Sequence, residues 1–166
     1  KLRDFMRSHK LAAICGVAGS GKTILAMGHA QELARCGLRT LFLCYNKPLK
    51  EWVRKVIQPD ADGNLVVENY HGIAADLCAK AQMDCWPEKG SNPPRSFWED
   101  EAPAHLMDAL DILGDEHKFD AIIVDDAQYF RDQWWISMDS LFCDPIDKCL
   151  FVFHGPKQNA FSSSAS

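Results

Sequence analysis

The chain has 166 residues, 47% of them hydrophobic and 25% charged, which is typical of one soluble globular domain with a substantial core. Its 23 acidic and 18 basic residues give a net charge of −5, which argues against nucleic-acid binding through the field of the whole protein but not through a local cleft. No apolar run approaches the roughly 18 residues that cross a bilayer, and the N-terminus lacks a signal-peptide pattern, so we expect no membrane partner.

Hydrophobic patterning predicts six elements in the first half of the chain: strands at 11–15, 39–45 and 64–70, and helices at 22–36, 47–58 and 71–82. The short apolar run at 11–15 is expected to be a buried strand. The run at 39–45 is continuously hydrophobic, as parallel strands covered on both faces are. The helix at 22–36 should turn these side chains inward: Ile24, Leu25, Met27, Ala30, Leu33 and Ala34.

The helix at 47–58 is amphipathic and has one apolar and one basic face. Its apolar residues are Leu49, Trp52, Val53, Val56 and Ile57. Its basic residues are Lys47, Lys50, Arg54 and Lys55. The basic face has two readings that the sequence leaves even: a track for a nucleic-acid backbone or an ordinary solvated surface.

The second half begins with a loop at 83–95, followed by an acidic helix to about 113 that Ser96 and Glu99 should start as a capping box and that should be interrupted near Pro103. A strand at 119–128, a helix at 132–142 and a strand at 148–154 follow. Trp134 and Trp135 are expected in the core. Strands that alternate with helices predict an α/β fold, a three-layer αβα sandwich with a mainly parallel sheet.

Seven cysteines are spread through apolar segments without a CxxC pair or a paired zinc spacing. They are Cys15, Cys36, Cys44, Cys78, Cys85, Cys143 and Cys149. This pattern predicts reduced, buried thiols in a cytoplasmic protein rather than a zinc or disulfide framework.

The stretch GVAGSGKT at 16–23 fits the phosphate-loop pattern GxxxxGK[ST], with an apolar strand before it and a helix after it. Glycines let backbone N–H groups turn inward around an anion, and the helix N-terminus adds its dipole. Lys22 is expected to reach the β- and γ-phosphates of ATP and the Thr23 hydroxyl to bind Mg²⁺. The predicted nucleotide contacts are Gly16, Ala18, Gly19, Ser20, Gly21, Lys22, Thr23 and Ile24. The alternative is a glycine-rich turn without a ligand.

An acidic pair follows the apolar run AIIV at the end of the strand at 119–128. A phosphate loop needs such a carboxylate on a neighbouring strand to hold Mg²⁺, and Asp125 has this position. Asp126 beside it is the candidate general base for the attacking water. The alternative is a pair of aspartates that caps the turn after the strand.

With both sites placed, nearly the whole chain resembles the N-terminal RecA-like domain of UvrD/Rep-type superfamily 1 helicases. Five motifs occur in the family's order: GVAGSGKT (motif I), CYNKPLKEW (motif Ia), ENYHGIAADL, IIVDDAQYF (motif II) and FVFHGPKQNAF (motif III). The resemblance implies that Tyr45, Asn46 and Lys47 touch single-stranded DNA and that Gln158 senses the γ-phosphate. Tyr70 and His71 could also contact a base, although core packing and helix capping explain them equally well.

The resemblance implies one RecA-like domain over 1–161, a disordered tail at 162–166, and a second RecA-like domain as partner, without which the chain should not unwind DNA. Three positions depart from the family pattern. Asp126 replaces the usual glutamate, Gly155 or Pro156 replaces an aspartate, and Tyr129 replaces another. A base shortened by about 1 Å can slow a reaction on the order of 100-fold. We therefore expect a slow ATPase, or else a nucleotide-binding module without turnover. A small-molecule kinase explains fewer of the motifs.

Overall fold

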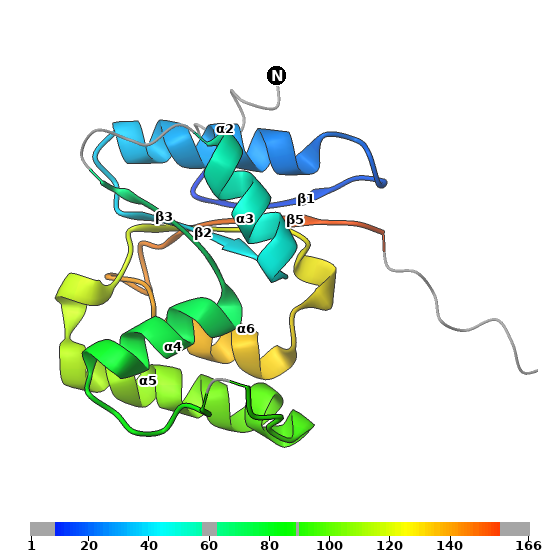
Figure 1. Cartoon of the computed structure of the whole chain (residues 1–166). Helices are drawn as coiled ribbons and strands as arrows, with labels where there is room; N and C mark the ends of the chain where they lie inside the picture. The colour runs from blue at the N-terminus through cyan, green and yellow to red at the C-terminus, as the bar shows by residue number, and fades with distance from the viewer. Residues whose placement is uncertain (1–8, 58–62, 89, 157–166) are drawn as a thin grey trace, which may run out of the picture.

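The computed structural model describes residues 9–57, 63–88 and 90–156 (Figure 1). Its elements are β1 (Leu11–Cys15), α2 (Lys22–Arg35), β2 (Thr40–Cys44), α3 (Lys47–Val56), β3 (Leu65–Asn69), α4 (Tyr70–Lys80), the π-helical turn η1 (Phe97–Glu101), α5 (Ala102–Leu113), the 3₁₀ turn η2 (Asp115–His117), β4 (Ala121–Val124), the 3₁₀ turn η3 (Ala127–Tyr129), α6 (Asp132–Asp139) and β5 (Cys149–His154). Among these, no helix is long and apolar enough to cross a membrane.

The strands form one five-stranded sheet in the order β1-β5-β4-β2-β3, and every neighbouring pair is parallel. Helices α2 and α3 cover one face, and α4, α5 and α6 cover the other (Figure 1). Alternate residues of β2 serve two cores: Leu41 and Leu43 pack beneath α4–α6, whereas Phe42 and Cys44 pack beneath α2 and α3. The predicted α/β fold with a parallel sheet is confirmed. The carboxyl ends of all five strands therefore lie along the same side of the sheet, where ligands of such sheets usually bind.

Strand β1 differs from the buried strand that the sequence predicts, because it lies at the edge of the sheet. Leu11 is 57% exposed, and every second residue of β1 is open to solvent. The other face of the strand, with Ala12 and Ile14, packs against the core beneath α2. Ile24 in the first turn of α2 is exposed as well, although its spacing predicted an inward position.

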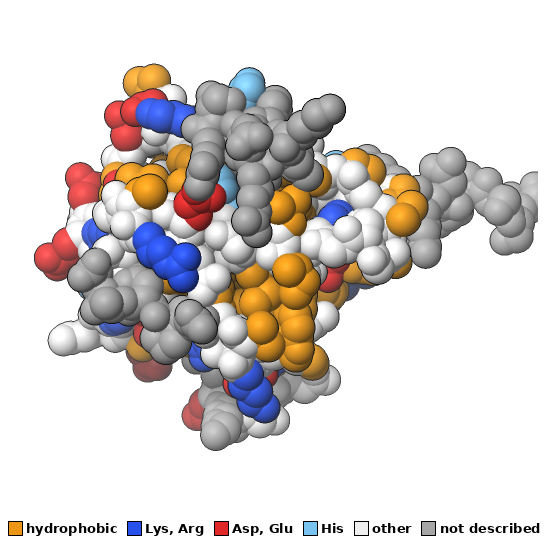
Figure 2. Space-filling view, turned by 90° about the horizontal axis from the view of Figure 1, so that it is seen from above, with side chains coloured by type: hydrophobic (Ala, Val, Ile, Leu, Met, Phe, Trp, Pro, Cys, Tyr) orange, Lys and Arg blue, Asp and Glu red, His pale blue; other side chains and the backbone are white. Residues whose placement is uncertain are grey.

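The apolar face of α3 is only partly buried. Val53 and Ile57 belong to the core, whereas Trp52 is 42% exposed and Val56 is also exposed. Figure 2 views the face that carries α2 and α3 and shows hydrophobic side chains gathered on part of it. The amphipathic pattern identified the helix but did not show how much of its apolar side the sheet can cover.

The helix before β4 does not begin with the predicted capping box. Ser96 makes no side-chain cap hydrogen bond, and Glu99 Oε1 instead faces Arg95 Nε at 2.8 Å and Arg131 Nε at 3.3 Å. The predicted interruption near Pro103 is confirmed, because the chain passes from the π-helical turn η1 into α5 just before this residue. Proline has no N–H to donate to the preceding turn, which favours a wider turn there.

All seven cysteines are described and are free thiols. Cys44, Cys78 and Cys149 are buried, as the sequence predicts, and burial raises the pKa of Cys44 to about 12. Cys15, Cys36 and Cys143 are exposed, which corrects the prediction for them. Of the two tryptophans expected in the core, Trp134 is buried and Trp135 packs against the same core while partly exposed.

Candidate functional site

The turn between β1 and α2 depends on glycine at three positions. Gly19 (φ 76°) and Gly21 (φ 80°) adopt the left-handed region that favours glycine. The Gly16 N–H donates to His154 O at 3.1 Å, and a Cβ on Gly16 would lie 2.7 Å from Ser20 Oγ. The turn therefore has the backbone conformation and the space that an inward-facing set of N–H groups requires.

Lys22 places a positive charge at this turn. Its Nζ donates to Gly16 O at 2.6 Å and to Val17 O at 2.9 Å, so the ammonium group lies over the turn rather than in open solvent. Lys22 is also the first residue of the 14-residue helix α2, whose N-terminus carries a partial positive charge. Both effects favour an anion at the same place.

Asp125 directly follows β4, and its N–H donates to Leu43 O at 2.9 Å. Its side chain is 0% exposed, yet neither carboxylate oxygen has a hydrogen-bond partner among the described residues. Burial raises the pKa of the Asp125 carboxyl, and the charge of Asp126 adds to this effect. The Thr23 hydroxyl, which is near enough to act as a donor although outside ordinary hydrogen-bond geometry, and the Lys22 ammonium lower the pKa. A buried carboxylate without a partner destabilises a fold, which indicates a ligand that the carboxylate is placed to meet.

The fold brings the glycine-rich turn and the acidic pair to one edge of the sheet. Strand β5 alone separates β1 from β4, and two strand spacings correspond to about 10 Å. Thr23 and Lys22 lie close enough to Asp125 to lower its pKa. Segments more than 100 residues apart in the sequence, at Lys22 and Asp125, thus meet in one site.

Asp126 has an unusual backbone conformation for a residue other than glycine, with φ 55° in the left-handed region. Gln128 Nε2 donates to Asp126 Oδ1 at 3.3 Å, and Gln128 Oε1 accepts from the Gly155 N–H at 3.0 Å. Gln128 therefore connects the turn after β4 with the end of β5. Gln158, the predicted γ-phosphate sensor, lies outside the described residues, as does the predicted tail at 162–166.

The donor set suits a hydrated Mg²⁺ with a triphosphate. Among described residues, no group of three or more His, Cys, Asp or Glu side chains is placed to hold a metal ion. Mg²⁺ needs no such cage, because it usually binds one or two carboxylates together with waters and substrate phosphates. The unpartnered Asp125 carboxylate and the Thr23 hydroxyl are the residues that fit this role.

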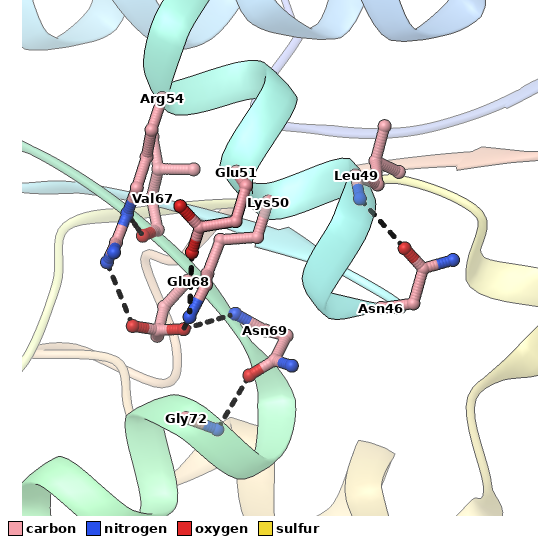
Figure 3. Close-up of polar contacts among 9 residues, drawn as sticks. All are labelled: Asn46, Leu49, Lys50, Glu51, Arg54, Val67, Glu68, Asn69 and Gly72. Atoms are coloured by element: carbon pink, nitrogen blue, oxygen red, sulfur yellow. Dashed lines mark hydrogen bonds and ion pairs between the residues drawn. The ribbon is translucent and has the colours of Figure 1, made fainter.

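The predicted nucleic-acid contacts after β2 have three different roles. Tyr45 is exposed, and its ring lies 4.7 Å from that of Tyr129. Asn46 caps α3, because its Oδ1 accepts from the Leu49 N–H at 2.8 Å (Figure 3). Lys47 is exposed and has no ion pair among the described residues.

Two of the four basic residues of α3 form ion pairs within the protein. Glu68 of β3 pairs with Lys50 Nζ at 2.8 Å and with Arg54 at 2.9 Å (Figure 3). Arg54 Nε also donates to Val67 O at 3.0 Å. Lys50 and Arg54 are thus engaged by Glu68, although Arg54 stays exposed, whereas Lys47 and Lys55 are exposed and have no ion pair among the described residues.

The prediction that Tyr70 could contact a base is wrong, because Tyr70 is 1% exposed and belongs to the core. Its ring stacks on Trp134 with centroids 4.6 Å apart, and its hydroxyl bonds to Ser137 Oγ. Burial raises the pKa of the Tyr70 hydroxyl above its ordinary value. Of the two alternatives that the sequence left open, core packing holds, and no surface of Tyr70 remains for nucleic acid. His71 is only partly buried and lines a cavity.

This cavity was not predicted from the sequence. It measures about 460 Å³ and lies beside the N-termini of α3 and α4, where Lys47, Asn69 and His71 line it together with Trp86 and Trp98. Trp86 comes from the loop predicted at 83–95, whereas Trp98 belongs to η1, within the helix predicted to start at Ser96. A second cavity of about 690 Å³ opens near the amino ends of the strands, far from the glycine-rich turn.

The sequence matches no protein-family model and no curated protein. The function is therefore argued from the geometry of the site.

Proposed function

We propose that the chain is an ATP-binding and ATP-hydrolysing RecA-like domain of the superfamily 1 helicase type, which acts on single-stranded nucleic acid. One observation carries the proposal: the buried, unpartnered Asp125 carboxylate faces Thr23 and Lys22 at the glycine-rich turn. A strand-to-helix turn without a ligand would not require an unpaired carboxylate next to it, because burying one without compensation costs free energy.

The residues of the site divide the task of holding Mg·ATP. Backbone N–H groups of the turn and the N-terminus of α2 receive the phosphate oxygens, and Lys22 neutralises the β- and γ-phosphates. Thr23 and Asp125 hold Mg²⁺, which supplies charge stabilisation to the phosphates when it is bound. Ile24, exposed at the start of α2, is placed to contact the rest of the nucleotide.

For hydrolysis, Asp126 orients and deprotonates the attacking water. Its backbone is in the left-handed region, unlike that of a regular strand, so its side chain leaves the β4 end in a different direction from that of Asp125. Gln158 remains the proposed sensor of the γ-phosphate. The partners we propose are single-stranded DNA, contacted by Tyr45, Lys47 and His71, and a second RecA-like domain; the proposed compartment is the cytoplasm.

Steady-state ATP hydrolysis by the purified chain, with and without single-stranded DNA, tests the proposal. We expect Mg²⁺-dependent turnover that DNA stimulates and that Lys22→Ala abolishes, because the phosphates lose their main countercharge. Lys55→Ala is the matched control for turnover without DNA, since Lys55 is an exposed lysine on α3. If Lys22→Ala binds and hydrolyses ATP as the wild type does, the proposal is wrong.

A nucleotide-binding module without turnover is the second candidate, and the bond from Gln128 Nε2 to the short Asp126 side chain favours it. In that case the carboxylate is held away from the water that it would activate. Saturable ATP binding without hydrolysis, in the wild type and also in Asp126→Glu, would establish this candidate. Turnover that appears in Asp126→Glu would instead show that side-chain length limits the reaction.

A further inference from the structure

The cavity between α4 and the segment that precedes α5 has aromatic walls. Trp86 and Trp98 lie edge to face with ring centroids 6.0 Å apart, and the His71 ring lies 4.8 Å from that of Trp98. All three side chains line the cavity and are partly exposed. Its volume of about 460 Å³ falls within the range of about 300–1,000 Å³ that ligand pockets have.

The charge of the cavity differs from that of the whole molecule. The chain has a net charge of −5, but the residues that line the cavity include no acid and one cation, Lys47. The nearest acid along β3, Glu68, is neutralised by Lys50 and Arg54. Burial lowers the pKa of His71, with Lys47 nearby adding to the effect, so the imidazole is neutral at pH 7. The cavity thus suits a flat, uncharged ring with a negative group beside it.

Asn69 adds a polar group at the edge of this cavity. Its Oδ1 accepts from the Gly72 N–H at 2.8 Å and caps α4 (Figure 3). This bond fixes the side chain and leaves the NH₂ group of Asn69, a donor, for a ligand in the cavity that Asn69 lines. A base with an exocyclic carbonyl, such as thymine or uracil, would accept from it.

We propose that this cavity binds one unpaired base of single-stranded nucleic acid, stacked against Trp86 and Trp98, with the adjoining phosphate on Lys47. The inference rests on the proposed function for the class of ligand. It adds Trp86 and Trp98, which lie outside the five motifs, to Lys47 and His71, which lie within them. The cavity opens at the carboxyl ends of β2 and β3, the same sheet edge as the phosphate turn after β1. Three to four strand spacings, roughly 14–19 Å, separate the two sites, so both can be occupied together.

Fluorescence anisotropy with a labelled oligothymidylate and a matched oligonucleotide with central abasic residues tests the base contact. We expect the wild type to prefer the oligothymidylate. Trp86→Ala should weaken its binding by about 5- to 100-fold, the usual effect of losing a stacked base, and should remove the preference over the abasic probe. Trp86→Phe should restore most of the affinity. Trp52→Ala, which removes an exposed tryptophan outside the cavity, should change nothing.

Lys47→Gln tests the phosphate contact separately. It should weaken the binding of both probes alike. It should also reduce the slope of log affinity against log salt concentration by about 1, as the loss of one phosphate contact does. A Trp86→Ala variant that keeps the full preference for the base-bearing probe would overturn the inference, as would a Trp98→Ala variant with the same behaviour.

Binding of a fluorescent ATP analogue to the same samples separates this inference from the proposed function and reports folding of each variant. Normal ATP binding without oligonucleotide binding overturns the base pocket and leaves the nucleotide site standing. If the wild type does not bind the ATP analogue, the proposed function is wrong. Trp86-dependent binding of an acidic, tyrosine-rich peptide, without oligonucleotide binding, would assign the cavity to a protein partner instead.

Discussion

At the scale of single residues, Asp125 lowers the stability of the fold and also has a role in the proposed site. The carboxylate is buried without a partner, and burial raises its pKa, so the folded state binds the proton more tightly than the unfolded state. A group of this kind lowers stability as pH rises from its unfolded pKa through its folded pKa, and the penalty is complete once the pH exceeds the folded pKa.

We therefore expect Asp125→Asn to raise the free energy of unfolding at pH 7 by about 1 kcal/mol, because a buried amide costs less than a buried carboxylate. The advantage should disappear on acidification, when the wild-type carboxyl is also neutral. Urea denaturation at several pH values without Mg²⁺ measures this. The same variant should lose the Mg²⁺-dependent part of ATP affinity. A variant that is less stable than the wild type at neutral pH would contradict this account.

The residues of the phosphate turn and the acidic pair could be predicted from the sequence, because each group is contiguous and its chemistry is set by local spacing. Tyr70 and Trp86 could not be assigned in this way. Their roles depend on which elements pack against them: Tyr70 meets Trp134 of α6, whereas Trp86 meets Phe97 and Trp98 of η1. No periodicity within their own segments encodes these contacts.

At the scale of elements, the joint between β3 and α4 depends on Gly72. A Cβ at this position would collide with the carboxylate of Glu68 and with Asn69 Oδ1. Glu68 cannot move freely, because Lys50 and Arg54 hold it (Figure 3), and Asn69 Oδ1 caps α4.

Gly72→Ala should lower the free energy of unfolding by about 1–3 kcal/mol, as overpacking at a rigid site does. In a Glu68→Ala background the same change should cost less, since the closest obstacle is gone; urea denaturation of the four proteins gives this coupling as a double-mutant cycle. Equal costs in both backgrounds would show that Glu68 is not the obstacle.

Hydrophobic periodicity predicted the types and the order of the elements, but it predicted the residues at which they end less accurately. The strand predicted at 119–128 is shorter, Ala121–Val124, because Asp126 turns the backbone into the left-handed region. The helix predicted at 132–142 ends at Asp139, since Phe142 instead forms a bridge with Phe119. Both ends are decided by tertiary contacts that the local pattern does not contain.

At the scale of the whole molecule, the strand order could not be predicted, because patterning does not say which strands are neighbours. The exposure of β1 and the proximity of Lys22 to Asp125 both follow from that order. If Mg·ATP bridges the turn after β1 and the carboxylate after β4, binding should stabilise the whole sheet.

We expect Mg·ATP at 100 times its dissociation constant to add about 2.7 kcal/mol to the free energy of unfolding, which raises Tm by about 5–10 °C for a chain of this size. Differential scanning fluorimetry measures the shift. Lys22→Ala should show almost none at the same concentration, whereas Lys55→Ala should behave as the wild type does. A shift of equal size in Lys22→Ala would place the nucleotide elsewhere.

The end of β5 connects the two parts of the proposed nucleotide site, the glycine-rich turn and the acidic pair. His154 O accepts from the Gly16 N–H of the phosphate turn, and the neighbouring Gly155 N–H donates to Gln128, which also holds Asp126. A displacement of the backbone at His154 and Gly155 would therefore shift both the glycine-rich turn and Asp126, the proposed general base. In the proposed function, this couples the position of the β5 end to both parts of the nucleotide site.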